Sequence, residues 1–159
     1  MKSIAEITES LSKTPEILIE LLNEIPSDLL KKRRIEHKWT IHEHACHIAL
    51  GDKFGFHKRI VAFKNELEPK FDPLSGESFD KTFYYEMNLN KALVEFKQLR
   101  RKTIELTNDQ EPKIWNKNAI HPEYEKYTPY IMLRHLLMHD YFHIYRIEEL
   151  WLTKEKYLK

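Results

Sequence analysis

Glycine and cysteine are both scarce in this chain of 159 residues, which contains three glycines and one cysteine. A single cysteine excludes a disulfide within the chain and suits a reducing compartment such as the cytoplasm. Apolar residues recur at three- and four-residue spacing rather than alternating. Together with so few glycines, that spacing favours an all-helical fold.

The sequence also lacks a long apolar run and a strong net charge. No segment approaches the length needed to cross a membrane, and residues 1–10 carry charges where a signal peptide needs an apolar stretch. The formal net charge is +1 and the basic run at residues 31–34 is short, so we expect neither nucleic acid nor a membrane as a partner. With 42% hydrophobic and 32% charged residues, residues 1–159 are expected to form a single cytoplasmic domain.

Two helices are predicted in the first half of the chain. An apolar stripe over residues 4–11 predicts a short helix, which Thr14 and Pro15 interrupt and restart as N-cap and first helical residue. The restarted helix ends at Pro26, and residues 27–39 form a connection.

The second helix is predicted from a capping box. Thr40 and Glu43 have the required spacing, with the threonine bonding forward and the glutamate reaching back, and the helix is expected to run to about Leu67. The residues expected to face inward are Ala45, Ile48, Ala49, Phe56, Ile60 and Phe63.

Long connections separate the remaining helices. Residues 68–79 contain two prolines and a glycine, and they predict a loop long enough to cross from one end of a bundle to the other. A third helix is expected from about Asp80 to Thr107, on a stripe of leucines around Phe96. Residues 108–127 are predicted to be a loop, after which Thr128 and Pro129 open a last helix that ends near Leu152. The sequence therefore predicts a four-helix bundle with long crossover loops.

Histidines are the main functional signal. His135, His139 and His143 fall on one stripe of the last helix, and a polar stripe inside a bundle needs partners, which a metal ion supplies. Histidines four apart on a helix can share one ion, but the spacing leaves open whether the pair is His135 with His139 or His139 with His143. A third nitrogen must come from elsewhere, and His47 is the best candidate because three nitrogens with an open position make a metal reactive.

A second group of histidines precedes His47. The run from His42 resembles the His-Glu-x-x-His motif of zinc proteases, but the fifth position is Cys46. His42 and His47 also lie about 140° apart around the helix axis, so they do not grip one ion. We predict that His42 and His44 face solvent and that Cys46 is a small buried packing residue.

Trp39, which directly precedes Thr40, is expected to be a hydrophobic anchor rather than a platform for substrate.

Two motifs resemble the DinB-like superfamily, also called the DinB/YfiT-like metalloenzymes. Residues 38–48 are similar to the family's Trp-Ser/Thr-x-x-Glu-x-x-x-His pattern, and residues 135–150 are similar to its C-terminal His-x-x-x-His helix. Residues 121–128 also look like the segment that precedes this helix in the family. The resemblance spans nearly the whole chain.

This resemblance implies a four-helix bundle with one metal ion held by His47, His139 and His143, and frequent homodimerisation. It therefore favours the pair His139 and His143 over the pair His135 and His139. A divalent ion such as zinc, nickel or iron is expected, because imidazole suits all of them and availability often decides.

Three further residues are candidates for a role around the metal or the substrate. Glu43 and Asp140 are candidates to orient a ligand imidazole, although Glu43 is primarily a cap and Asp140 is equally compatible with surface exposure. Arg146 stands where many relatives have glutamine, which suggests a preference for a carboxylate-bearing substrate. A structural ion pair of Arg146 with Glu149 or Asp140 explains it equally well.

Three functions are compatible with these residues. Three neutral imidazoles leave a divalent ion its full charge, which activates a bound water or thiol as a nucleophile. Branches of the superfamily transfer small thiols such as bacillithiol or mycothiol, so thiol S-transfer to a small electrophile is the leading hypothesis. A metal-dependent hydrolase is the second. The third is a non-catalytic, stress-associated, metal-binding helical dimer.

Overall fold

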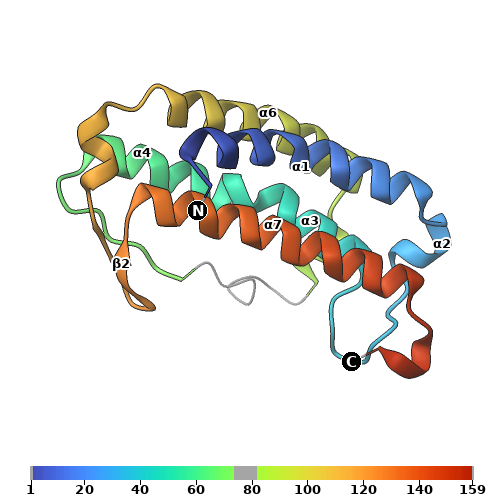
Figure 1. The fold of residues 1–159 in the computed structure, drawn as a ribbon. Helices are drawn as coiled ribbons and strands as arrows, with labels where there is room; N and C mark the ends of the chain where they lie inside the picture. The colour runs from blue at the N-terminus through green and yellow to red at the C-terminus, as the bar shows by residue number, and fades with distance from the viewer. Residues whose placement is uncertain (1, 74–81, 159) are drawn as a thin grey trace.

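Four long helical segments run side by side in the computed structural model, which describes residues 2–73 and 82–158 (Figure 1). They are α1 (Ile4–Glu24), a rod made of α3 (Ile41–Gly51), η1 (Asp52–Phe56) and α4 (His57–Asn65), then α6 (Leu89–Asn108) and α7 (Pro129–Leu152). Helices α1 and α3 each pack against α6 and α7, so α1 and α3 lie at opposite corners of the bundle. The predicted all-helical four-helix bundle is confirmed.

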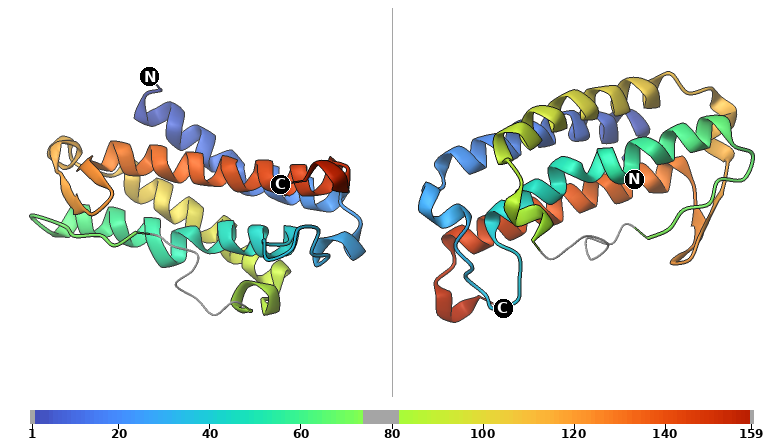
Figure 2. Two further views of the ribbon diagram at one scale, coloured as in Figure 1. Left: turned by 90° about the horizontal axis from the view of Figure 1, so that it is seen from below. Right: turned by 180° about the vertical axis from the view of Figure 1, so that it is seen from behind.

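Short elements connect these helices. A β-hairpin of β1 (Ala119–His121) and β2 (Tyr124–Tyr127) lies at one end of the bundle, and α2 (Ser27–Leu30) lies at the other (Figures 1 and 2). The remaining short helices are α5 (Phe83–Glu86), η3 (Pro112–Asn116) and η4 (Glu155–Tyr157). Within residues 2–73 and 82–158, every helix is too short or too polar to cross a lipid bilayer.

The predicted interruption of the first helix at Thr14 and Pro15 is wrong. Helix α1 continues through Pro15 without a break. A proline inside a helix has no N–H for the carbonyl four residues earlier, which is that of Leu11. Arg100 Nη1 donates to the Leu11 carbonyl at 3.2 Å, and Thr14 Oγ1 lies 3.0 Å from the same oxygen. The carbonyl is therefore satisfied from outside the helix backbone, and α1 stays intact.

The second helix begins as predicted and contains an unpredicted turn. Thr40 Oγ1 accepts from the Glu43 amide at 3.2 Å, and Glu43 Oε2 accepts from the Thr40 amide at 2.7 Å. The rod ends at Asn65, close to the predicted Leu67, and all six residues predicted to face inward are buried. Its middle, η1, is a π-helical turn, a feature that often accompanies functional sites.

The prediction of one continuous third helix from Asp80 to Thr107 is wrong. Asp80 and residues 74–79 of the predicted loop lie outside the described residues, and α5 ends at Glu86. Helix α6 then starts at Leu89, because the Asn88 side chain accepts from the Lys91 amide at 2.9 Å and caps it. The buried face of α6 is more polar than the predicted leucine stripe. It consists of Ala92, Phe96, Arg100, Thr103 and Thr107.

The predicted loop at residues 108–127 contains the hairpin. Strands β1 and β2 pair antiparallel, with Ala119 opposite Tyr127. The hairpin is also tied to an earlier part of the chain, since the Ile120 amide donates to the Pro69 carbonyl at 2.9 Å. These contacts place the fully buried Tyr127 directly before α7, whose N-cap Thr128 and last residue Leu152 are as predicted.

A polar layer separates the two larger apolar clusters of the core. One cluster gathers around Phe56, Phe63 and Leu136, and the other gathers around Leu18, Ile48 and Phe96. Between them each long helix contributes one buried polar residue, in the order Thr14, Asp52, Arg100 and Asp140. The histidines predicted as metal ligands belong to the same level of the bundle.

Candidate metal centre

His47, His139 and His143 come together between α3 and α7. One ligand atom from each residue can be chosen so that all three lie within 4.8 Å of one another. The Nε2 atoms of His47 and His139 are 2.8 Å apart, and the rings of His47 and His143 have centroids 4.6 Å apart. Nitrogens bound at about 2.0–2.1 Å to one tetrahedral ion lie roughly 3.3 Å from each other, so the spacing fits a single small cation.

His47, His139 and His143 form the triad. Residues outside the triad contact the Nδ1 atoms of two of its rings. His47 Nδ1 lies 3.1 Å from the Tyr84 hydroxyl, and His143 Nδ1 lies 2.8 Å from His44 Nδ1. When Nδ1 carries the hydrogen and donates to these partners, Nε2 keeps its lone pair for an ion. Histidine ligands usually need such a partner to fix their orientation and tautomer.

His139 has a different outer partner. Its buried Nδ1 atom lies 3.6 Å from Asp140 Oδ1, and neither atom makes a hydrogen bond among residues 2–73 and 82–158. The Asp140 carboxylate is fully buried, so the alternative of surface exposure is wrong. A small ring rotation brings the His139 N–H to this oxygen and leaves Nε2 directed at the triad. The residues present therefore fit a divalent ion with three nitrogen ligands.

Burial keeps the imidazoles of His44, His47 and His143 neutral. Desolvation, followed by repulsion from His139 and His44, lowers the pKa of His47 to about 3. Desolvation lowers the pKa of His44 to about 4, and the pKa of His143 also falls well below its ordinary value. Neutral rings are the form that binds a metal, so at neutral pH the lone pairs are available without the loss of a proton.

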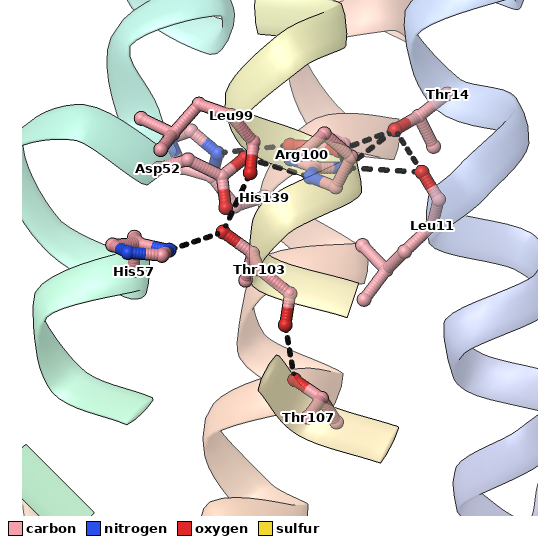
Figure 3. A network of polar contacts seen from close by, with 10 residues as sticks. Leu11, Thr14, Asp52, His57, Leu99, Arg100, Thr103, Thr107 and His139 are labelled. Atoms are coloured by element: carbon pink, nitrogen blue, oxygen red, sulfur yellow. Dashed lines mark hydrogen bonds and ion pairs between the residues drawn. The ribbon is translucent and has the colours of Figure 1, made fainter. Parts of the chain in front are cut away.

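Arg100 lies behind the triad and joins all four long helices. Its Nε donates to Asp52 Oδ2 at 2.7 Å, and its Nη1 donates to Asp140 Oδ2 at 2.6 Å and to Thr14 Oγ1 at 2.6 Å (Figure 3). Burial alone would raise the pKa of Asp140, but the charge of Arg100 and its hydrogen bond to the carboxylate outweigh this effect and lower the pKa. Asp140 is therefore held as an anion against His139.

Glu43 and Arg146, the other two candidates for a role around the metal or the substrate, make structural contacts. Glu43 is buried, caps α3 and forms an ion pair with Arg33 at 3.1 Å. Arg146 pairs with Glu149 one turn further along α7, which is one of the two structural pairings considered above. Arg146 is still close enough to lower the pKa of His44 and His143.

The prediction that His42 and His44 face solvent is wrong. Both are buried, because α5 and Trp39 cover the start of α3. His44 contacts His143, and His42 Nε2 lies 3.6 Å from the sulfur of Cys46. Cys46 is fully buried, as predicted, and desolvation raises its pKa to about 12.

Trp39 lies against the site. Its ring centroid is 4.7 Å from that of His47, and it stacks on His143 at 5.8 Å. It therefore forms a wall of the histidine cluster rather than only an anchor for α3. His135 stands apart from the triad, since its Nδ1 lies 3.1 Å from the Tyr127 hydroxyl.

Comparison with known proteins identifies the family. The family model of the DinB superfamily matches residues 10–147. The chain belongs to the DinB superfamily. Among solved structures, this DinB-superfamily chain is similar to YfiT from Bacillus subtilis, described as a probable metal-dependent hydrolase with an unusual four-helix bundle topology. The two share 18% identity with a TM-score of 0.80, over 94% of this chain and 88% of YfiT. No curated protein matches the chain.

The buried histidines predict a pH dependence for the stability of the metal-free DinB-superfamily protein. Desolvation lowers the pKa of His44 and of His135 to about 4, whereas the unfolded chain titrates near 6.5. Below pH 6.5 the unfolded state therefore binds more protons, and the free energy of unfolding falls as the pH falls. We expect a loss of at least about 2 kcal/mol between about pH 7.5 and about pH 5 in urea titrations.

Variants assign this pH dependence to the buried rings. His135→Gln should reduce the slope, and His37→Asn should leave it unchanged because His37 is exposed. A free energy of unfolding that stays flat over this range contradicts the neutral, buried state of these rings.

Proposed function

We propose that this protein binds one divalent metal ion through His47, His139 and His143 and uses it in a reaction on a small-molecule substrate. The observation that carries the proposal is the convergence of three imidazoles, that of His143 buried and those of His47 and His139 partly buried. Tyr84 and His44 hold two of these rings from behind, and the third ring faces Asp140. The description of YfiT as a probable metal-dependent hydrolase supports metal-dependent chemistry in this fold.

Each part of the chain has a distinct task in this proposal. A divalent ion supplies the charge that lowers the pKa of a water or thiol ligand and so gives a nucleophile near neutral pH. Asp140, held by Arg100, orients His139, and the Trp39 ring limits the access of water to His143. The chain does not supply a thiolate itself, because Cys46 is fully buried and its pKa is raised to about 12. A thiol nucleophile must therefore come from solution.

The nucleophile distinguishes the two catalytic versions. Transfer of a small thiol to an electrophile is the leading version, and attack by water is the second, which the description of YfiT favours. Untagged protein loaded with Zn²⁺ or Ni²⁺ should convert 1-chloro-2,4-dinitrobenzene only when a small thiol such as cysteine or bacillithiol is added. Hydrolysis of 4-nitrophenyl acetate at a comparable rate without thiol would favour the second version.

A third result in this assay would remove both catalytic versions. Metal bound at full occupancy with neither activity above that of His139→Ala would support a non-catalytic metal-binding protein. The single free and buried Cys46 suits a reducing compartment, which supports the cytoplasm as the proposed location.

We also propose that the protein forms a homodimer through the outer face of α7. That face is apolar although it is exposed, with Met138, Tyr141, Phe142, Tyr145 and Leu152 all at least 38% accessible. Antiparallel pairing about a twofold axis between residues 141 and 142 would place Met138 opposite Tyr145 and Arg134 opposite Glu149. Such a surface is complementary to itself, as a twofold interface requires.

The mass in solution tests this interface. Light scattering should give the mass of two chains for the wild type and of one chain for Tyr145→Glu. The matched control Val94→Glu changes an equally exposed apolar residue on α6 and should remain dimeric. A monomeric wild type, or a Tyr145→Glu variant that stays dimeric, would remove this face from consideration.

A further inference from the structure

A buried chain of hydrogen bonds leads from Arg59 through Tyr127 to His135. Arg59 Nη1 donates to the Tyr127 hydroxyl oxygen at 2.7 Å, and the same oxygen lies 3.1 Å from His135 Nδ1. A guanidinium group only donates hydrogen bonds, so the direction of the first bond is fixed. Tyr127 is fully buried, which keeps solvent away from its hydroxyl group.

The hydroxyl hydrogen of Tyr127 has one acceptor among the described residues. Within residues 2–73 and 82–158, the Tyr127 hydroxyl contacts only Arg59 and His135, and Arg59 accepts nothing. Desolvation raises the pKa of Tyr127 to about 12, so the hydrogen stays on the oxygen at neutral pH. Tyr127 therefore donates to His135 Nδ1, and Nδ1 is the acceptor.

This bond fixes the tautomer of His135. Desolvation, with the charge of Arg59, lowers the pKa of His135 to about 4, so the ring is neutral. A neutral imidazole whose Nδ1 accepts carries its hydrogen on Nε2. That nitrogen has no lone pair for a metal ion, which rules out the alternative ligand pair His135 with His139.

His135 lies on the same helix as two residues of the triad. His135 precedes His139 by one helical turn, about 6 Å along the axis of α7. The ring of Phe56 packs against both histidines, with centroid distances of 5.3 Å to His135 and 5.8 Å to His139. The His135 ring is only half-buried, and its Nδ1 edge faces the buried Tyr127 hydroxyl, so the opposite edge is the one open to a ligand.

We infer that His135 binds the substrate, donating its Nε2 hydrogen to a carbonyl or carboxylate oxygen that lies a few bonds from the atom held at the metal. This inference rests on the proposed function. The substrate class is a small molecule with an oxygen acceptor at one end. The neutral His135 ring donates a hydrogen bond, and the positive charge of Arg59 lies behind it, so the site attracts such an oxygen and repels a cation. His135 thus determines specificity, while His47, His139 and His143 hold the ion.

The tautomer is measured first, on Zn²⁺-loaded and on metal-free protein. In ¹⁵N spectra of histidine-labelled chain, with His135 assigned through His135→Gln, we expect the pattern of a neutral Nε2–H ring. Tyr127→Phe removes the hydroxyl group that donates to Nδ1 and should give a mixture of tautomers. Tyr124→Phe is the matched control, because Tyr124 contacts the His135 ring at 5.7 Å but makes no hydrogen bond to it among the described residues. An Nδ1–H pattern, or a metal-ligand pattern at His135, would overturn the inference.

The substrate class is measured with a matched pair of ligands. The visible spectrum of Co²⁺-loaded protein reports ligands at the ion, and succinate and butyrate differ only in the second carboxylate. Wild type should bind succinate about ten- to a hundredfold more tightly than butyrate, the effect of one hydrogen bond to a charged oxygen. His135→Phe should remove this preference and His135→Gln should retain part of it, both with unchanged Co²⁺ content.

The outcomes separate this inference from the proposed function. Failure of Co²⁺ to bind to wild type overturns the proposed function, and the substrate role of His135 with it. Normal Co²⁺ binding without a preference for succinate, or with a preference that His135→Phe retains, overturns only the inference.

Discussion

Replacing His139 with alanine is expected to abolish metal binding. His139 lies at the centre of the triad, with its Nε2 atom 2.8 Å from that of His47 and its ring 4.7 Å from that of His143. Loss of an outer partner of a ligand histidine typically costs 10- to 100-fold in affinity, so loss of the ligand itself should cost more than about a hundredfold. Isothermal titration with Zn²⁺ should give one site per chain in wild type and no saturable site in His139→Ala.

Two variants accompany this titration. Asp140→Asn keeps the triad but weakens the partner of His139, and it should lie between wild type and His139→Ala, with an affinity about 10- to 100-fold below wild type. His37→Asn removes an exposed histidine that is not one of the three ligands, and this variant should bind like wild type. Equal affinity in wild type and His139→Ala would show that the ion binds elsewhere on the chain.

Replacing Arg100 with methionine is expected to cause the largest loss of stability of any single substitution considered for this chain. Arg100 is 1% exposed and balances two carboxylates, Asp52 and Asp140, that are both fully buried. Removing one partner of a buried ion pair leaves uncompensated charge and costs about 3–5 kcal/mol. The Leu11 carbonyl, which receives no backbone hydrogen bond from Pro15, also loses the bond from Arg100 Nη1. Denaturant titration of the metal-free chain should show this loss in the free energy of unfolding.

The neighbouring Arg101 provides the control for this substitution. Arg101 is exposed, so Arg101→Met should change the free energy of unfolding by less than about 0.5 kcal/mol. Adding Asp52→Asn and Asp140→Asn to Arg100→Met removes both uncompensated charges and should restore part of the stability. A change below about 1 kcal/mol in Arg100→Met would mean that the buried carboxylates are neutral, contrary to the lowered pKa of Asp140.

The sequence predicted those parts of the fold that local rules control. The capping box at Thr40 and the cap-plus-proline start at Thr128 each depend on residues at most three apart, and both helices begin where predicted. The histidine stripe on α7 also follows from helical spacing alone. That spacing could not choose between the two ligand pairs, since it is identical for His135 with His139 and for His139 with His143.

Features that depend on distant contacts were not predicted. Pro15 interrupts a helix by local rules, but Arg100, 85 positions later, supplies the missing donor. His42 and His44 were expected in solvent because the first turn of a helix is often exposed, and only the packing of α5 and Trp39 buries them. Tyr84 carries no pattern that marks it as a partner of His47. Arg100 did carry a signal, because it follows Ala92 and Phe96 at four-residue spacing on the inner face of α6.

Anomalous scattering from crystals of untagged protein, measured at the absorption edge of the metal that copurifies, tests the metal centre most directly. We predict one peak per chain, within about 2.0–2.2 Å of the Nε2 atoms of His47, His139 and His143, and no metal bonded to His135. A peak held by other residues, or metal-free crystals in which the triad stays in place after soaking with Zn²⁺, would contradict the proposed site.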